Sequence, residues 1–163
     1  MAARTFGTVS PEQFKAMNAL AFVQGLASGV LPLNTIARIL GYEVVEADPG
    51  RVVIAAQPTQ EHLNPWGTVH GGLTATLLDS CMGLAVQTML ENGIGSTTLE
   101  FKVSLIRPYH AANRSDSRGG HAFELRPACR HRGRPRHRPG RALARARHDL
   151  LPHFSALSRP LPA

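Results

Sequence analysis

One apolar segment, residues 73–90, limits the possible folds more than any other feature of the chain. Its apolar side chains lie on nearly all sides of a helix, so other elements must surround it. Asp79 is the single charged residue in the segment. Placing a carboxylate among apolar neighbours is costly, which indicates that Asp79 has a function.

The segments on either side of this helix have strand and turn character. Residues 42–47 and 51–57 are joined by Asp48-Pro49-Gly50, a turn sequence, and predict a hairpin. Residues 97–106 alternate as a strand, and one face is expected to carry Leu99, Phe101, Val103 and Leu105.

Two helices are expected ahead of this hairpin. The sequence Ser10-Pro11-Glu12-Gln13 is a helix start with a capping residue and a proline at the first helical position. It predicts a helix that runs to about residue 26. A short helix is expected within residues 33–40, ending at Gly41.

Together these elements predict an α+β architecture, in which an antiparallel sheet is wrapped around the central helix. Three strands are too few to cover a helix of eighteen residues, so further strands are required after residue 110. The sequence there shows neither helical nor strand periodicity. It therefore indicates that the C-terminal strands are lost.

The charge distribution divides the chain at about the same place. Residues 1–110 hold six Lys or Arg and eight Asp or Glu, whereas residues 111–163 hold twelve Arg, no Lys and three acidic residues. The overall charge of +7 thus combines −2 and +9. We expect residues 1–112 to form a partial domain and residues 113–163 to be an irregular tail rich in Arg and Pro.

Two interpretations fit the composition of this tail. A genuine basic arm would bind nucleic acid or another anionic surface. Alternatively, Arg mixed with Pro, His, Ala and Gly is what a GC-rich gene yields when it is read out of frame. Permitted codons for residues 113–154, read one base later, encode strand-like segments and a turn, which favours a frame change near codon 113.

The residues immediately before and within the central helix form a candidate site. Asn64 and Trp66 lie in the preceding loop, His70-Gly71-Gly72 opens the helix, and Asp79 follows nine residues after His70. Unpaired N–H groups at a helix start can polarise a carbonyl and hold an oxyanion. Glycine lets a substrate approach this backbone closely. Asp79 is suited to act as a nucleophile or general base for acyl transfer to water.

The pattern from Asn64 to Asp79 resembles the signature of hotdog-fold acyl-CoA thioesterases of the phenylacetate-degradation, or PaaI-like, type, and the resemblance covers about residues 36–110. It implies a hotdog fold and cofactor-free hydrolysis of an aryl- or medium-chain acyl-CoA. It also implies a homodimer that often pairs into a homotetramer. In this family pattern Asn64 lies beside the substrate carbonyl or the attacking water, and the Thr98 hydroxyl can hold that water.

Helix geometry also bears on assembly. Gly71 and Asp79 are eight residues apart, which corresponds to about 12 Å along a helix. A single thioester carbon cannot lie beside both residues of one chain. The site therefore requires two subunits, with Gly71 of one facing Asp79 of the other.

Each candidate residue also has a structural interpretation. Asp79 can be a buried carboxylate held by hydroxyl groups, and His70 can simply fix the loop before the helix. Asn64 can be a turn residue, and Thr98 can be an ordinary strand residue. Trp66 either lines an acyl or pantetheine channel or only packs against the protein.

Several other features of the sequence limit the possible functions. Gly72 is expected near the substrate, and Lys102 and Arg107 are candidates for contacts with CoA phosphates. No His or Cys spacing typical of a metal site is present, and there is no phosphate-binding loop. The two cysteines, Cys81 and Cys129, form no disulfide framework, which favours a reducing cytoplasm. Residues 19–33 are too short and too interrupted to span a bilayer.

Three outcomes compete with acyl-CoA hydrolysis. The chain can be a non-catalytic or dehydratase-like hotdog protein that binds acyl-CoA, although an Asp rather than a second His at position 79 favours hydrolysis. A genuine basic tail would favour nucleic-acid binding. A frame change would leave an open sheet edge and a partly bare helix, and such a chain would be inactive and prone to aggregate.

Overall fold

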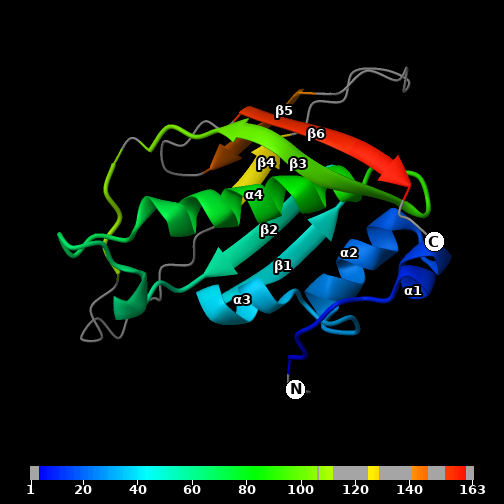
Figure 1. Ribbon diagram of the computed structural model, residues 1–163, viewed down its shortest axis with the longest axis horizontal. Helices are drawn as coiled ribbons and strands as arrows, with labels where there is room; N and C mark the ends of the chain where they lie inside the picture. The colour runs from blue at the N-terminus through cyan, green and yellow to red at the C-terminus, as the bar shows by residue number, and fades with distance from the viewer. Residues whose placement is uncertain (1–3, 106, 112–124, 129–140, 147–152, 161–163) are drawn as a thin grey trace.

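The computed structural model describes residues 4–105 and 107–111, together with the backbone of residues 125–128, 141–146 and 153–160 (Figure 1). Its helical elements are α1 (Pro11–Ala16), α2 (Ala19–Ser28), α3 (Thr35–Leu40), the 3₁₀ turn η1 (Gln60–His62) and α4 (Gly71–Gln87). Its strands are β1 (Tyr42–Asp48), β2 (Arg51–Ala56), β3 (Ile94–Lys102), β4 (Leu125–Ala128), β5 (Arg141–Ala146) and β6 (His153–Pro160).

The strands form one antiparallel sheet in the order β1-β2-β4-β5-β6-β3. The long helix α4 runs across this sheet, with β1 and β2 on one side of it and β3 and β6 on the other (Figure 1). An antiparallel sheet around one long helix is the predicted α+β plan, and it is the hotdog fold. β1 and β3 form the two edges of the sheet.

The structure differs from the expectation that the C-terminal strands are lost. β4, β5 and β6 lie within residues 113–163, the segment expected to be irregular, and they fill the sheet between β2 and β3. The physical reason is that strand pairing uses backbone N–H and C=O groups, which the edges of β2 and β3 present whatever side chains the added strand carries. The junctions are unequal: β2 meets β4 at the single pair Ile54↔Leu125, whereas β3 follows β6 along its whole length.

Side-chain caps define the helices that precede the sheet. Ser10 Oγ accepts from the Gln13 N–H at 3.2 Å and the Ser10 N–H donates to Gln13 Oε1 at 3.4 Å, which is the expected capping box. The single helix expected to reach residue 26 is instead two helices, because Asn18 Oδ1 accepts from the Ala21 N–H at 2.7 Å and begins α2. α3 ends as expected at Gly41, whose φ of 64° suits glycine.

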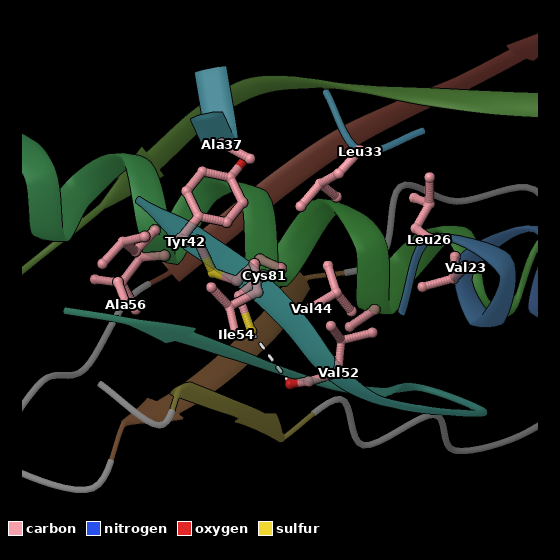
Figure 2. Close-up of a cluster of buried hydrophobic side chains, with 14 of the residues drawn as sticks. Val23, Leu26, Leu33, Ala37, Tyr42, Val44, Val52, Ile54, Ala56 and Cys81 are labelled. Atoms are coloured by element: carbon pink, nitrogen blue, oxygen red, sulfur yellow. Dashed lines mark hydrogen bonds between the residues drawn. The ribbon is translucent and has the colours of Figure 1, made fainter. Parts of the chain in front are cut away.

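The core lies between α4 and the inner faces of β1 and β2. The buried side chains that the helix and these strands contribute include Leu77, Leu78, Met82, Val44, Val52 and Ile54. Cys81 lies within the same cluster, and its thiol donates to Val52 O at 3.2 Å (Figure 2). Burying one aliphatic side chain contributes about 1.5–3 kcal/mol, so this cluster holds α4 firmly on the sheet.

β3 does not alternate as predicted. Its register with β6 shifts between Thr98 and Glu100, which makes Leu99 an extra residue in the strand. Leu99 is 56% exposed, whereas Phe101 packs against the core. The bulge therefore places Thr98, and not Leu99, on the face that looks towards α4.

Candidate active site

The side chain of Asn64 closes the loop before α4. Its Oδ1 accepts from the Trp66 N–H at 3.0 Å and from the Thr68 N–H at 3.1 Å, and its Nδ2 donates to Thr68 Oγ1 at 2.7 Å. Gly67, with φ of 78°, completes the turn. Asn64 thus has the structural role considered for it, and its position beside a substrate stays a prediction.

His70 is the N-cap residue of α4. Its Nδ1 accepts the Gly72 N–H at 2.9 Å, and its own backbone N–H donates to His62 O at 2.8 Å. Because Nδ1 is an acceptor, the neutral ring carries its proton on Nε2. His70 therefore fixes the start of the helix and, because the residue is exposed, presents an Nε2–H donor there.

Gly71 and Gly72 expose backbone at the start of α4. In the described part of the chain the Gly71 N–H has no hydrogen-bond partner, whereas the Gly72 N–H is bound by His70. A side chain at Gly71 would come within 2.7 Å of Leu105 Cδ1. The helix dipole adds partial positive charge at this end. The Gly71 N–H is thus the backbone donor best placed to bind an oxyanion.

Asp79 lies further along α4 and is half-buried rather than enclosed. Thr98 donates to its Oδ1 at 2.6 Å, a short hydrogen bond to a charged acceptor. Among the described residues, no donor bonds to Oδ2. Thr98 therefore orients the carboxylate directly, and Oδ2 is open to water or a substrate.

One side of α4 is not covered by the residues that the structure describes. Gly72, Thr76, Asp79 and Gly83 follow one another at helical spacing, and each is at least partly exposed. A side chain at Gly83 would meet no atom of the described residues within 4 Å. Met82 is buried in the core, because it lies about 60° around the helix from Asp79 on the covered side. The open side leaves room for a substrate or a second helix.

A cleft of about 270 Å³ adjoins the start of α4. Its walls come from α3, η1, the following loop and α4, and they are formed by Leu40, Glu61, His62, Leu63, His70, Gly72, Leu73 and Thr76. Sequence reasoning missed the contribution of η1. The available signal was the position of Glu61 and His62 directly ahead of Asn64.

The other candidate residues lie apart from this cleft. Trp66 is 85% exposed and does not line this cleft, so it does not pack closely within the described part of the chain. Its place in an acyl or pantetheine channel stays a prediction. Lys102 and Arg107 are exposed at the end of β3 and beyond it. Cys129 and most of the arginine-rich segment that would bind nucleic acid fall outside the described residues.

Across the described residues, no three His, Cys, Asp or Glu side chains lie together as metal ligands would. No helix in the described part of the chain combines the length and the apolar composition needed to cross a membrane.

The sequence matches known thioesterases over the segment that carries the site. Residues 66–114 match the family model of the thioesterase superfamily. Human acyl-coenzyme A thioesterase 13 is 36% identical over 72 residues, which cover 44% of this chain and 51% of the human protein. The chain thus spans about half the length of the curated relatives it matches.

Solved structures are similar over most of the chain. A phenylacetic acid degradation-related protein from Ralstonia eutropha has a TM-score of 0.66 and 22% identity, covering 83% of this chain and 98% of its own. A variant of the phenylacetic acid degradation protein PaaI from Thermus thermophilus has a TM-score of 0.55 and 26% identity, covering 76% of this chain and 97% of its own.

The segment that matches the family model is also the segment that forms the candidate site in the fold. The matched segment contains His70, Gly71, Asp79 and Thr98, which are the residues that the structure gathers on α4 and β3. The chain has the hotdog fold, and the segment that carries the candidate site is similar to the thioesterase superfamily and to acyl-coenzyme A thioesterase 13.

Proposed function

We propose that the protein is an acyl-CoA thioesterase that hydrolyses an aryl- or medium-chain acyl-CoA. The observation that carries the proposal is the Thr98–Asp79 pair, in which a 2.6 Å hydrogen bond holds one carboxylate oxygen and leaves the other open on the uncovered side of α4. Similarity to human acyl-coenzyme A thioesterase 13 supports the thioester substrate. Similarity to phenylacetic acid degradation proteins supports an aryl acyl group.

Two reaction courses use the same carboxylate. As a general base, Asp79 removes a proton from water while the water oxygen attacks the thioester carbon. As a nucleophile, Asp79 forms an anhydride with the acyl group, and water then cleaves that anhydride. In both courses the carbonyl oxygen becomes negative, the Gly71 N–H stabilises it, and the C–S bond breaks as the coenzyme A sulfur leaves and takes up a proton.

A complete site needs two copies of the chain. Gly71 and Asp79 lie about 12 Å apart along one helix, too far to serve one carbonyl carbon. The uncovered side of α4, with open space at Gly83, supports a second copy whose α4 faces the first. We therefore place Gly71 of one copy opposite Asp79 of the other, in a homodimer that can pair into a homotetramer.

Complementation between two variants tests this arrangement. Gly71→Val and Asp79→Asn proteins should each be inactive, but a mixed dimer contains one site in which both residues are intact. Random mixing should restore about a quarter of wild-type activity, because about half of the dimers are mixed and about half of their sites are complete. Mixtures that stay inactive after subunit exchange overturn the shared site.

A panel of thioesters tests the substrate class. Wild-type protein is expected to release coenzyme A thiol from phenylacetyl-CoA and octanoyl-CoA. Binding of both compounds without thiol release would instead identify a non-catalytic acyl-CoA-binding protein. The cytoplasm is the proposed location, because the two cysteines in the sequence form no disulfide framework.

A further inference from the structure

Three consecutive residues of α4 form hydrogen bonds to three different strands. The bonds are Asp79 with Thr98 of β3 at 2.6 Å, Ser80 with Tyr42 of β1 at 3.1 Å, and Cys81 with Val52 O of β2 at 3.2 Å. Consecutive residues of a helix point about 100° apart. The bonds therefore hold α4 from three directions around its axis.

The Tyr42 hydroxyl links α4 to a second helix. It donates to Asn34 Oδ1 at 3.0 Å. Because a hydroxyl group has one proton, Tyr42 must accept its other hydrogen bond from Ser80 Oγ. Tyr42 is only 1% exposed, so close packing of its ring fixes the position of the hydroxyl. A chain of hydrogen bonds thus runs from Ser80 through Tyr42 to Asn34 at the start of α3.

Apolar contacts alone define the rotation of α4 poorly. The helix is apolar on most sides, and the free energy of apolar burial depends on area rather than on direction. Hydrogen bonds, in contrast, require alignment of donor and acceptor. Ser80 is adjacent to Asp79, so any rotation of α4 that breaks the Ser80–Tyr42 bond also turns Oδ2 of Asp79 away from its position.

We propose that the Ser80–Tyr42–Asn34 chain positions Asp79 for catalysis by setting the rotation of α4 against the sheet. Tyr42 and Ser80 are positioning residues, because they act through Asp79 and touch neither substrate nor reacting atoms. The inference rests on the proposed function, which gives Asp79 its reaction. Beyond that function, it assigns Tyr42 of β1 and Ser80 of α4 an effect on kcat that comes only from the position they give Asp79.

Hydroxyl removal at either end of the Ser80–Tyr42 bond tests the proposal in the full-length chain. Tyr42→Phe keeps the buried ring, and Ser80→Ala keeps the helix. Each variant should lower kcat for phenylacetyl-CoA about ten-fold and leave KM near the wild-type value, since small displacements of a catalytic group cost rate rather than binding. In an Asp79→Asn background, Tyr42→Phe should change the residual rate by less than about two-fold.

Thr88→Val is the matched control. It removes a buried hydroxyl that bonds to the Gly50 N–H at 2.8 Å and to Ala85 O at 2.7 Å, at the far end of α4 from Gly71. It should lower the melting temperature but leave kcat unchanged. A purely structural role for Tyr42 would make Tyr42→Phe behave in the same way.

Amide hydrogen exchange supplies a readout that does not depend on activity. Tyr42→Phe and Ser80→Ala should speed exchange in α4 around Asp79, whereas Thr88→Val should do so only near the C-terminal end of α4. Wild-type kcat in both Tyr42→Phe and Ser80→Ala overturns the proposal, as does unchanged exchange around Asp79. If wild-type protein hydrolyses no acyl-CoA, the proposed function fails by itself and the exchange data decide the positioning role.

Discussion

The hydrogen bond from Thr98 to Asp79 holds the proposed catalytic carboxylate directly, so the rate should depend on it. Thr98→Val removes the hydroxyl and keeps the branched shape that strands favour. In the described part of the chain, Thr98 is the sole donor to the Asp79 carboxylate. Without it, the carboxylate of Asp79 can rotate, and Oδ2 is no longer held towards the open side of α4.

The size of the effect can be worked out from this bond. A hydrogen bond to a charged group contributes about 1.5–3 kcal/mol. Asp79 is half-buried, so water can replace part of the lost interaction and the lower end of the range applies. A factor of ten in rate corresponds to about 1.4 kcal/mol. We therefore expect Thr98→Val to lower kcat about ten-fold with little change in KM.

The assay is release of coenzyme A thiol from phenylacetyl-CoA at saturating substrate. Thr98→Ser is the matched control, because it keeps the hydroxyl and should keep most of the activity. A Thr98→Val protein with wild-type kcat would refute the reasoning. So would a Thr98→Ser protein as slow as Thr98→Val, since the hydroxyl would then not be the group that matters.

Three further outcomes concern Gly71, Tyr109 and the encoding DNA. Gly71→Ala should displace only the exposed end of the Leu105 side chain and change the free energy of unfolding by less than about 1 kcal/mol. It should nevertheless lower kcat/KM at least about ten-fold. Denaturant titration measures the first effect and steady-state kinetics the second. Burial raises the pKa of Tyr109 above its ordinary 10.0, so the unfolded chain loses this proton first and stability should fall as pH rises through 10; Tyr109→Phe should flatten that decline in thermal unfolding. We also propose one extra base near codon 113, which sequencing of the encoding DNA from codon 105 onward would reveal or exclude.

Local signals predicted most of the elements ahead of α4. The Ser10–Gln13 box, the Asp48-Pro49-Gly50 turn and the stop at Gly41 act through neighbouring residues, so the sequence contains them in full. The break at Asn18 was missed because the apolar pattern continues through it, whereas a single side-chain cap decides where α2 begins.

Contacts between distant residues account for what the sequence could not predict in the site. The motif from Asn64 to Asp79 made Gly71 and Asp79 candidate site residues, but the direct bond between Asp79 and Thr98 depends on a bulge at Leu99. That bulge is set by pairing with β6, far along the chain. The Tyr42–Ser80 bond joins residues 38 positions apart and has no local signal.

Two observations about the C-terminal residues disagree on whether the reading frame changes near codon 113. β4, β5 and β6 complete the sheet, which argues against a frame change. The family match ends at residue 114, beside the change in composition, which argues for one. Every residue except proline offers a backbone N–H for pairing, so an added strand can form in either case. The DNA sequence separates the two cases.

The central claim is that Asp79 carries the hydrolysis of an acyl-CoA, and Asp79→Asn tests it most directly. The amide keeps the size of the side chain and can still accept from Thr98, but it neither removes a proton from water nor attacks a carbonyl. With phenylacetyl-CoA as substrate, kcat should fall about a thousand-fold while the melting temperature stays near that of the wild type. An Asp79→Asn protein that hydrolyses phenylacetyl-CoA as fast as the wild type would contradict the claim.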